Sequence, residues 1–220
     1  MKVVSFVAQK GGVGKSTLAI SCAVAAYQQG QNVLILDMDP QGSVESWYQD
    51  RSEDTPGVVC ITAPKIEQAI TAAAERGFDL IVIDTPGRDA PGIAAAIKVS
   101  DLVIIPCRPS VTDMKAIPAT FAMVHRLNKQ AAFVLSQTPV ATLARGSRIR
   151  EAEAGLSMLG MAAPVPIVSR LAYQDAHGLG LGVTEYEPNG KAAAEITRLW
   201  KWITTKLEKT TDETTQKNVA

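Results

Sequence analysis

The chain has 220 residues, of which 46% are hydrophobic, so it is long enough to bury one sizeable core. Lysine plus arginine and aspartate plus glutamate each number 22, which excludes binding to nucleic acid or acidic lipid through overall charge alone. Cys22, Cys60 and Cys107 form no CxxC pair and lie in apolar stretches, so we expect reduced, buried thiols in a cytoplasmic protein.

Residues 1–7 run directly into a strand pattern, without the apolar region and cleavage site of a signal peptide. The chain contains no run of about eighteen apolar residues, so we expect no membrane-spanning helix. These two features agree with a cytoplasmic protein.

Strand-length runs rich in valine and isoleucine alternate with longer stretches of helical spacing. The expected strands are 3–7, 33–36, 80–83, 102–105, 132–135 and 164–168. The expected helices are 16–29, 66–75, 114–127, 147–159 and 191–206. Continuous apolar strands between helices predict an α/β fold, a doubly wound and mostly parallel sheet with helices on both faces. In such a sheet, ligands bind at the carboxyl ends of the strands.

A phosphate-binding loop is expected between the first strand and the first helix. The segment reads Lys10, Gly11, Gly12, Val13, Gly14, Lys15, Ser16 and Thr17. A glycine-rich loop that opens a helix presents backbone N–H groups to phosphate oxygens, and a lysine adds positive charge. We therefore expect Lys15 to contact the β- and γ-phosphates of ATP, Ser16 to bind Mg²⁺, and Thr17 to support the α-phosphate.

Aspartates follow two of the expected strands. Asp37 and Asp39 come after the strand 33–36, and Asp84 follows the strand 80–83. A single aspartate after a strand often caps a helix, but three of them beside a phosphate-binding loop favour chemistry. We expect Asp84 to hold Mg²⁺ through water. No side chain in these motifs has the pattern of a nucleophile, which agrees with phosphoryl transfer to water.

The second lysine, Lys10, stands ahead of the first glycine pair, and this spelling resembles the deviant Walker A motif of the ParA/MinD family. The DxDPQ run that begins at Asp37 is similar to the family's switch I signature. A later R…A…G…V-x-E-Y pattern includes Arg170 and residues 183–186. The resemblance spans residues 1–205 and is strongest to short ParA-type partition ATPases that lack an N-terminal helix-turn-helix. We expect one P-loop ATPase domain over residues 1–207 and a polar, disordered tail over 208–220.

This resemblance implies a homodimer that encloses ATP between its subunits. Lys10 would reach across to the phosphates of the other subunit's ATP, Asp39 would orient the attacking water, and Asp37 would adjust the loop. The expected catalytic residues are therefore Lys10, Lys15 and Asp39. Adenine would lie against Gln137 and its neighbours, with the segment around Pro166 as a second wall.

The resemblance also implies a nucleoid-associated ATPase that binds DNA without sequence preference and positions a cargo. The cargo is a plasmid, a chromosome or a protein assembly, and a cargo-bound partner of the ParB type stimulates hydrolysis. DNA affinity requires several basic residues on one face. The candidates are Arg145, Arg148, Arg150 and Arg170. The alternative for each is an ordinary solvated helix face.

Two other classes use the same loop. A membrane-surface ATPase like MinD would need an amphipathic anchor, and residues 199–207 carry suitable aromatic and basic residues; their apolar stripe also suits a docked terminal helix. A metabolic synthetase would need a substrate pocket, and a nitrogenase-type iron protein would need interface cysteines, which the cysteine spacing does not provide. His125 and His177 have no metal-ligand spacing and are expected to be ordinary surface or packing residues.

Overall fold

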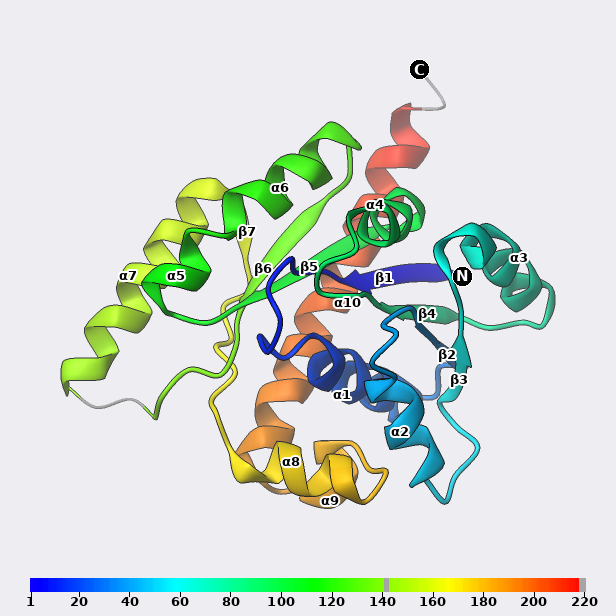
Figure 1. Ribbon diagram of the computed structural model, residues 1–220, viewed down its shortest axis with the longest axis horizontal. Coiled ribbons are helices and arrows are strands. Elements are labelled where there is room, and N and C mark those ends of the chain that lie inside the picture. Colours follow the sequence, from blue (N-terminus) through cyan, green and yellow to red (C-terminus); the bar gives the residue numbers. More distant parts are fainter. Residues whose placement is uncertain (141–142, 218–220) are drawn as a thin grey trace.

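The computed structural model describes residues 1–140 and 143–217, apart from the side chains of 143–145 and 210–217. Seven parallel strands form one sheet in the order β3-β2-β4-β1-β5-β6-β7 (Figure 1). The strands are β1 Lys2–Phe6, β2 Val33–Asp37, β3 Gly57–Cys60, β4 Leu80–Asp84, β5 Leu102–Cys107, β6 Ala131–Leu135 and β7 Met161–Ala162. The predicted parallel α/β sheet is confirmed.

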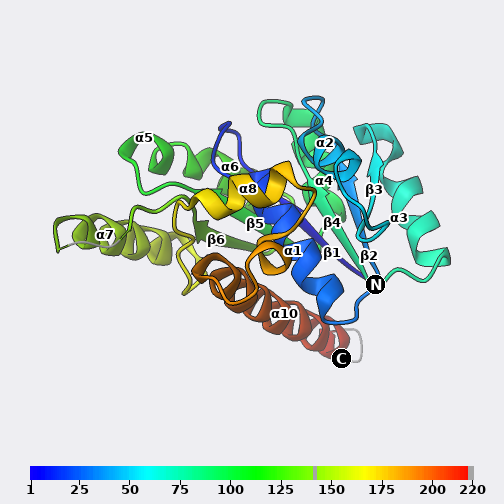
Figure 2. The same ribbon diagram turned by 90° about the horizontal axis from the view of Figure 1, so that it is seen from below.

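Helices cover both faces of the sheet, as the doubly wound prediction requires (Figure 2). The helices are α1 Lys15–Gln28, α2 Ser43–Gln49, α3 Ile66–Glu75, α4 Ala90–Val99, α5 Val111–Met114, α6 Ile117–Arg126, α7 Leu143–Leu159, α8 Leu171–Gly178, α9 Val183–Tyr186 and α10 Lys191–Lys217, with a 3-10 turn at Ala63–Lys65. One core joins α1 and α10 to the sheet, where Leu18 and Ile196 are buried. Two further cores lie under α3, α4, α6 and α7 on the opposite face.

The register of the three central strands determines where the loops meet. Asp37 at the end of β2 is directly opposite Asp84 at the end of β4, and Asp84 is also opposite Phe6 at the end of β1. The loops that follow these strands therefore leave the sheet at the same edge. In a parallel sheet this edge is the usual place for a ligand.

Two predicted elements were wrong in type or extent. Residues 164–168 are not a strand; Val168 makes only an isolated bridge with Thr138, and the edge strand is β7. Pro164 and Pro166 cannot donate ladder hydrogen bonds, which explains the difference. The single helix expected over 114–127 is α6, which begins only at Ile117, after the separate short helix α5 has ended at Met114. Pro118, which has no N–H, lies in the first turn of α6.

The other differences concern an edge strand and the chain end. β3 was not predicted, because its four residues are half-buried or exposed at the edge of the sheet. For the same reason Cys60 is exposed, where a buried thiol was expected. α10 runs to Lys217, beyond residue 206 where this helix was expected to end. In the described part of the chain, none of the helices is long and apolar enough to span a bilayer.

Candidate active site

The loop between β1 and α1 has the backbone geometry of an anion site. Gly12 and Gly14 have φ angles of 72° and 88°, in the left-handed region that glycine tolerates best. Gly14 occupies the N-cap position of α1, and no described side chain caps the helix there. The amides at the start of α1 therefore remain available to an anion.

Residues after β6 hold this loop from behind. The Ser136 hydroxyl donates to the Val13 carbonyl at 2.7 Å, and Gln137 Nε2 donates to the Gly12 carbonyl at 2.9 Å. Two of the loop carbonyls, those of Gly12 and Val13, are therefore occupied by protein donors. The sequence did not indicate this role for Ser136, because the contact joins residues far apart in the chain.

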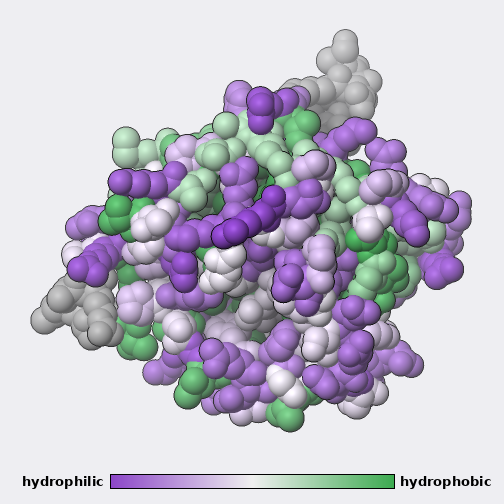
Figure 3. Space-filling model, in the orientation of Figure 1, coloured by the Kyte–Doolittle hydropathy of each residue, from purple (hydrophilic) through white to green (hydrophobic). Residues whose placement is uncertain are grey.

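A cavity of about 1040 Å³ opens beside the loop, large enough for a nucleoside triphosphate. Its walls are the loop and the start of α1, residues 39–43, residues 86–89 and one face of α8. The visible surface is hollowed near its centre, with hydrophilic residues around the hollow (Figure 3). Of the predicted nucleotide residues, those that line the cavity are Gly11, Gly12, Gly14, Lys15, Ser16, Thr17, Asp39 and Gln137.

Asp84 lies behind the cavity wall and is fully buried. Neither of its carboxylate oxygens accepts a hydrogen bond from the described residues, which is costly for an ionised group. Burial raises the pKa of Asp84 to about 7, although the neighbouring Ser16 hydroxyl and Lys15 ammonium oppose the shift. An orphaned carboxylate beside a serine hydroxyl fits a Mg²⁺ ion, which prefers oxygen ligands and retains water. Ser16 and Asp84 are the residues that would hold it.

Asp37 and Asp39 have different positions, as their different predicted roles require. Asp39 lines the cavity, and its carboxylate accepts from the Gln41 amide at 3.1 Å. Asp37 is buried and accepts from the amides of Asp39 at 3.0 Å and Glu45 at 3.1 Å. The second amide belongs to the first turn of α2. Asp37 therefore fixes the loop and the helix start, and it does not line the cavity as a nucleotide-binding residue would.

Lys10 does not line the cavity. Its ammonium forms an ion pair with Asp113 in α5 of the same chain. Asp113 also accepts from Arg108 Nε at 2.7 Å and from the Ser110 hydroxyl at 2.7 Å. Although burial raises the pKa of Asp113, the hydrogen bonds from Arg108, Lys10 and Ser110 hold it well below its usual value. Asp113 is therefore an ionised anchor for Lys10.

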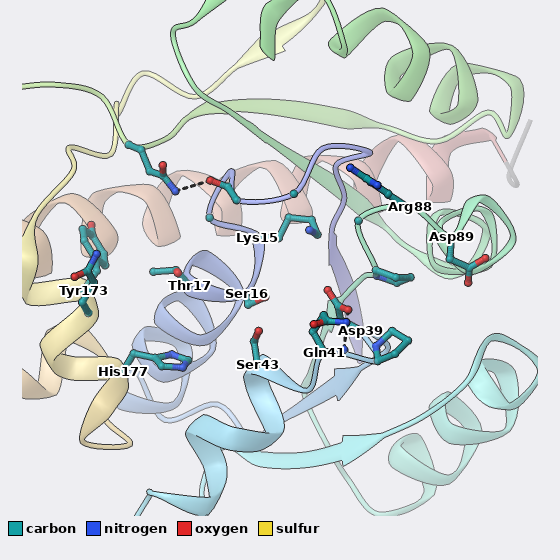
Figure 4. Close-up of a pocket in the computed structure, with 18 residues that line it drawn as sticks. Lys15, Ser16, Thr17, Asp39, Gln41, Ser43, Arg88, Asp89, Tyr173 and His177 are labelled. Atoms are coloured by element: carbon teal, nitrogen blue, oxygen red, sulfur yellow. Dashed lines mark hydrogen bonds between the residues drawn. The ribbon is translucent and has the colours of Figure 1, made fainter. Parts of the chain in front are cut away.

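One face of α8 forms the cavity wall opposite Asp39, and sequence reasoning missed it (Figure 4). Tyr173, Gln174 and His177 line this wall. The prediction that His177 is an ordinary surface or packing residue was therefore incomplete. Burial lowers the pKa of His177, so the imidazole favours its neutral form. The spacing of these residues is helical, but the sequence alone did not show which face of α8 meets the cavity.

A second cavity of about 180 Å³ adjoins the first, on the side of β6. Gln137, Tyr173 and Gln174 line both cavities. Pro166, predicted as an adenine wall, lines neither, whereas residues 167–170 line the smaller one. Pro166 therefore faces neither cavity, and the residues that meet adenine stay a prediction.

The four arginines predicted for DNA are not one group. Arg148 and Arg150 are exposed on α7. Arg145 lies in α7, and its side chain is outside the described part of the chain. Arg170 lines the smaller cavity and donates to Glu195 of α10 at 2.5 Å, so its charge is compensated inside the protein. Arg170 is therefore no longer a candidate for contact with DNA.

Two observations bear on the iron-protein and membrane-surface alternatives. Among the side chains that the structure describes, no cluster of three or more His, Cys, Asp or Glu residues could hold a metal ion. The apolar stripe of α10, including Leu199 and Ile203, is buried against the sheet and α1. The stripe therefore belongs to the core of the protein, as expected of a docked terminal helix.

Comparison with known proteins agrees with the geometry of the site. Residues 4–195 match the family described as "CobQ/CobB/MinD/ParA nucleotide binding domain". Maintenance of carboxysome distribution protein A of Gloeobacter kilaueensis is 34% identical over 128 residues, which span 57% of this chain and 56% of that protein. The protein of the same name from Halothiobacillus neapolitanus is 27% identical over 195 residues, or 84% and 88%. The Pyrococcus horikoshii septum site-determining protein MinD, solved with Mg-ADP, superposes with a TM-score of 0.71 at 17% identity, covering 92% of this chain and 95% of that one.

Proposed function

Because the chain belongs to the CobQ/CobB/MinD/ParA family of nucleotide-binding ATPases, with ATP and Mg²⁺ as cofactors, we propose that its ATP cycle positions a cargo inside the cell. ATP binding joins two copies of the chain into a sandwich homodimer. The dimer binds DNA without sequence preference in the nucleoid-containing cytoplasm. A cargo-bound partner of the ParB type then stimulates hydrolysis and releases the dimer.

The observation that carries this proposal is the convergence of three groups at one edge of the sheet. The uncapped start of α1 and Lys15 face the cavity, and Asp39 lines the same cavity from the loop after β2. Asp84, buried without a hydrogen-bond donor, lies behind Ser16. Groups suited to bind phosphate, to hold a metal ion and to orient water thus meet beyond the carboxyl ends of three adjacent strands.

Hydrolysis needs positioning and charge more than covalent chemistry. The α1 amides and Lys15 would hold the β- and γ-phosphates, and Asp39 would orient the water for attack on the γ-phosphorus. When bound at Ser16 and Asp84, Mg²⁺ supplies positive charge to the phosphate oxygens. Asp37 keeps Asp39 in place through the Asp39 amide.

One exposed pair of arginines supports DNA as the surface on which the dimer moves. Arg148 and Arg150 are exposed on α7, and a homodimer would present this pair twice. Each phosphate that such a pair neutralises adds a salt-sensitive contribution to binding.

A protein assembly is the cargo we favour, because both curated relatives described above are named for carboxysome distribution.

A binding assay on plain duplex DNA tests this function. We expect binding with ATP and no binding with ADP, and a loss of about tenfold or more in the Arg148→Ala/Arg150→Ala variant. A matched control, Arg76→Ala/Arg126→Ala, removes two exposed arginines, one directly after α3 and one at the end of α6, and should bind as the unchanged protein does. ATP-dependent binding to anionic vesicles, with none to DNA, would instead support a membrane-surface ATPase.

A further inference from the structure

The loop between β4 and α4 brings one arginine, Arg88, to the cavity. Both ends of this loop are fixed. At the β4 end, Thr85 is buried and its hydroxyl donates to the Phe6 carbonyl at 2.8 Å. At the α4 end, Asp89 caps the helix by accepting from the Gly92 amide at 3.1 Å. The residues between these anchors, Arg88 among them, line the cavity.

The same loop lies against the phosphate-binding loop. A Cβ atom added to Gly87 would be 3.7 Å from the Gly11 backbone and 3.7 Å from Lys15 Nζ. Arg88 is the next residue. Figure 4 shows Arg88, Lys15 and Asp39 on the side of the cavity away from Tyr173 and His177. Arg88 therefore lies on the phosphate side of the cavity.

Arg88 also differs from the neighbouring cations in its partners. It is exposed, and it makes no hydrogen bond or ion pair with any side chain or backbone group in the described residues. Lys10 and Arg108, by contrast, are both paired with Asp113. Among the described residues that line the cavity, Lys15 is the lysine and Arg88 is the arginine.

We propose that Arg88 is a catalytic residue that contacts the terminal phosphate of ATP bound in its own subunit. This inference rests on the ATPase function proposed above. In hydrolysis, the water oxygen forms a bond to the γ-phosphorus while the bond to the β–γ bridging oxygen breaks. The electron pair of that bond stays on ADP, and the water proton leaves to the released phosphate or to solvent.

Negative charge on the γ-oxygens and on the bridging oxygen changes during this step, and a guanidinium beside them stabilises the transition state. Arginine suits this position because it stays charged and can donate two parallel hydrogen bonds to a phosphate. Lysine could replace the charge but not the paired geometry. Arg88 would therefore act within one subunit, independently of Lys10.

The test compares the full-length protein with Arg88→Ala and Arg88→Lys. We expect Arg88→Ala to lower the rate of a single ATP turnover about 100-fold and Arg88→Lys about 10-fold, with ADP affinity within about twofold of the unchanged protein. Binding of ADP with aluminium fluoride, which imitates the transferred phosphoryl group, should weaken in parallel with the rate. Arg76→Ala, which removes an exposed arginine far from the cavity, is the matched control.

Two results would overturn the inference. One is an Arg88→Ala turnover rate within about threefold of the unchanged protein, and the other is an equal loss of ADP and transition-state-analogue binding. If the unchanged protein hydrolysed no ATP, the proposed function itself would fail.

Mixing variants tests whether Arg88 acts within its own subunit. An Arg88→Ala subunit and an Asp39→Asn subunit each lack one group, so a mixed dimer has no complete site if both groups act in their own subunit. Activity restored by mixing would show that Arg88 acts on the other subunit's ATP, against the proposal.

Discussion

Lys10 and Asp113 form an ion pair within a single chain, between the start of the phosphate-binding loop and α5. This pair has a direct consequence for the proposed dimer. If Lys10 contacts the ATP of the other subunit, it must first leave Asp113. The cost is moderated because Asp113 keeps its hydrogen bonds from Arg108 and Ser110 when Lys10 leaves.

The first prediction concerns Lys10→Ala. We expect ATP affinity of the monomer to stay within about twofold, because Lys10 does not line the cavity, and ATP-driven dimerisation to weaken about tenfold or more. Sedimentation with a non-hydrolysable ATP analogue measures the fractions of monomer and dimer, and titration with the analogue at low protein concentration measures the affinity of the monomer. Lys98→Ala, which breaks an exposed pair with Glu67, is the control. Unchanged dimerisation in Lys10→Ala would remove the proposed role of Lys10.

Asp39→Asn should separate dimerisation from hydrolysis. The amide cannot assist the water as a carboxylate does, so the rate of phosphate release should fall about 100-fold or more. Asp39 is expected to act on the attacking water and not on the phosphates, so the variant should still bind ATP and dimerise. Because hydrolysis is slow, an ATP-loaded dimer should accumulate. Gel filtration with ATP, together with a phosphate-release assay, measures these two effects. A variant that hydrolyses ATP at the normal rate contradicts the role given to Asp39.

The sequence predicted the site best where one short segment contains all the relevant information. Lys15, Ser16 and Thr17 line the cavity because a strand, a glycine-rich loop and a helix follow one another directly. Asp84 was found for the same reason, since it ends an apolar run. These motifs depend on local backbone geometry, which neighbouring residues determine.

Sequence reasoning failed where distant segments meet. Arg170 has the charge of a DNA contact, but Glu195 of α10 neutralises it. His177 has no recognisable motif, yet the packing of α8 brings it to the cavity. β3 is too short and too exposed for a clear apolar pattern. In each case tertiary contacts decide the outcome, and these do not follow from the spacing of residues along the chain.

A third prediction concerns the ion pair between Arg51, which follows α2, and Glu185 in α9. The Arg51 side chain is fully buried and donates to the Glu185 carboxylate at 2.7 and 2.9 Å, and its Nε donates to the Thr55 carbonyl at 2.6 Å. Arg51→Met leaves Glu185, which is largely buried, without its partner, so the free energy of unfolding should fall by about 3–5 kcal/mol. Urea unfolding measures the change.

Two further variants make the Arg51 prediction specific. Adding Glu185→Gln to Arg51→Met should recover part of the lost stability, because no unpaired charge remains. The exposed Lys98 and Glu67 pair is the control, and Lys98→Met should change stability by less than about 1 kcal/mol. A loss below about 1 kcal/mol in Arg51→Met would mean that the buried pair adds little to stability.

The last prediction is a pH dependence that comes from Asp84. Its pKa is raised from 3.8 to about 7 in the folded protein, so between these values the folded state holds a proton that the unfolded state has released. Stability without nucleotide should therefore fall as pH rises from about 4 to about 7, by at most about 1.4 kcal/mol per pH unit.

Asp84→Asn removes this slope, so near pH 8 the variant should resist urea better than the unchanged protein, and the difference should disappear toward about pH 4. Mg-ATP should stabilise the unchanged protein more than it stabilises Asp84→Asn, because the variant lacks the carboxylate that would hold Mg²⁺. Parallel pH profiles of the two proteins would show that Asp84 is already ionised when folded, and would remove the orphaned carboxylate as the reason for the metal site.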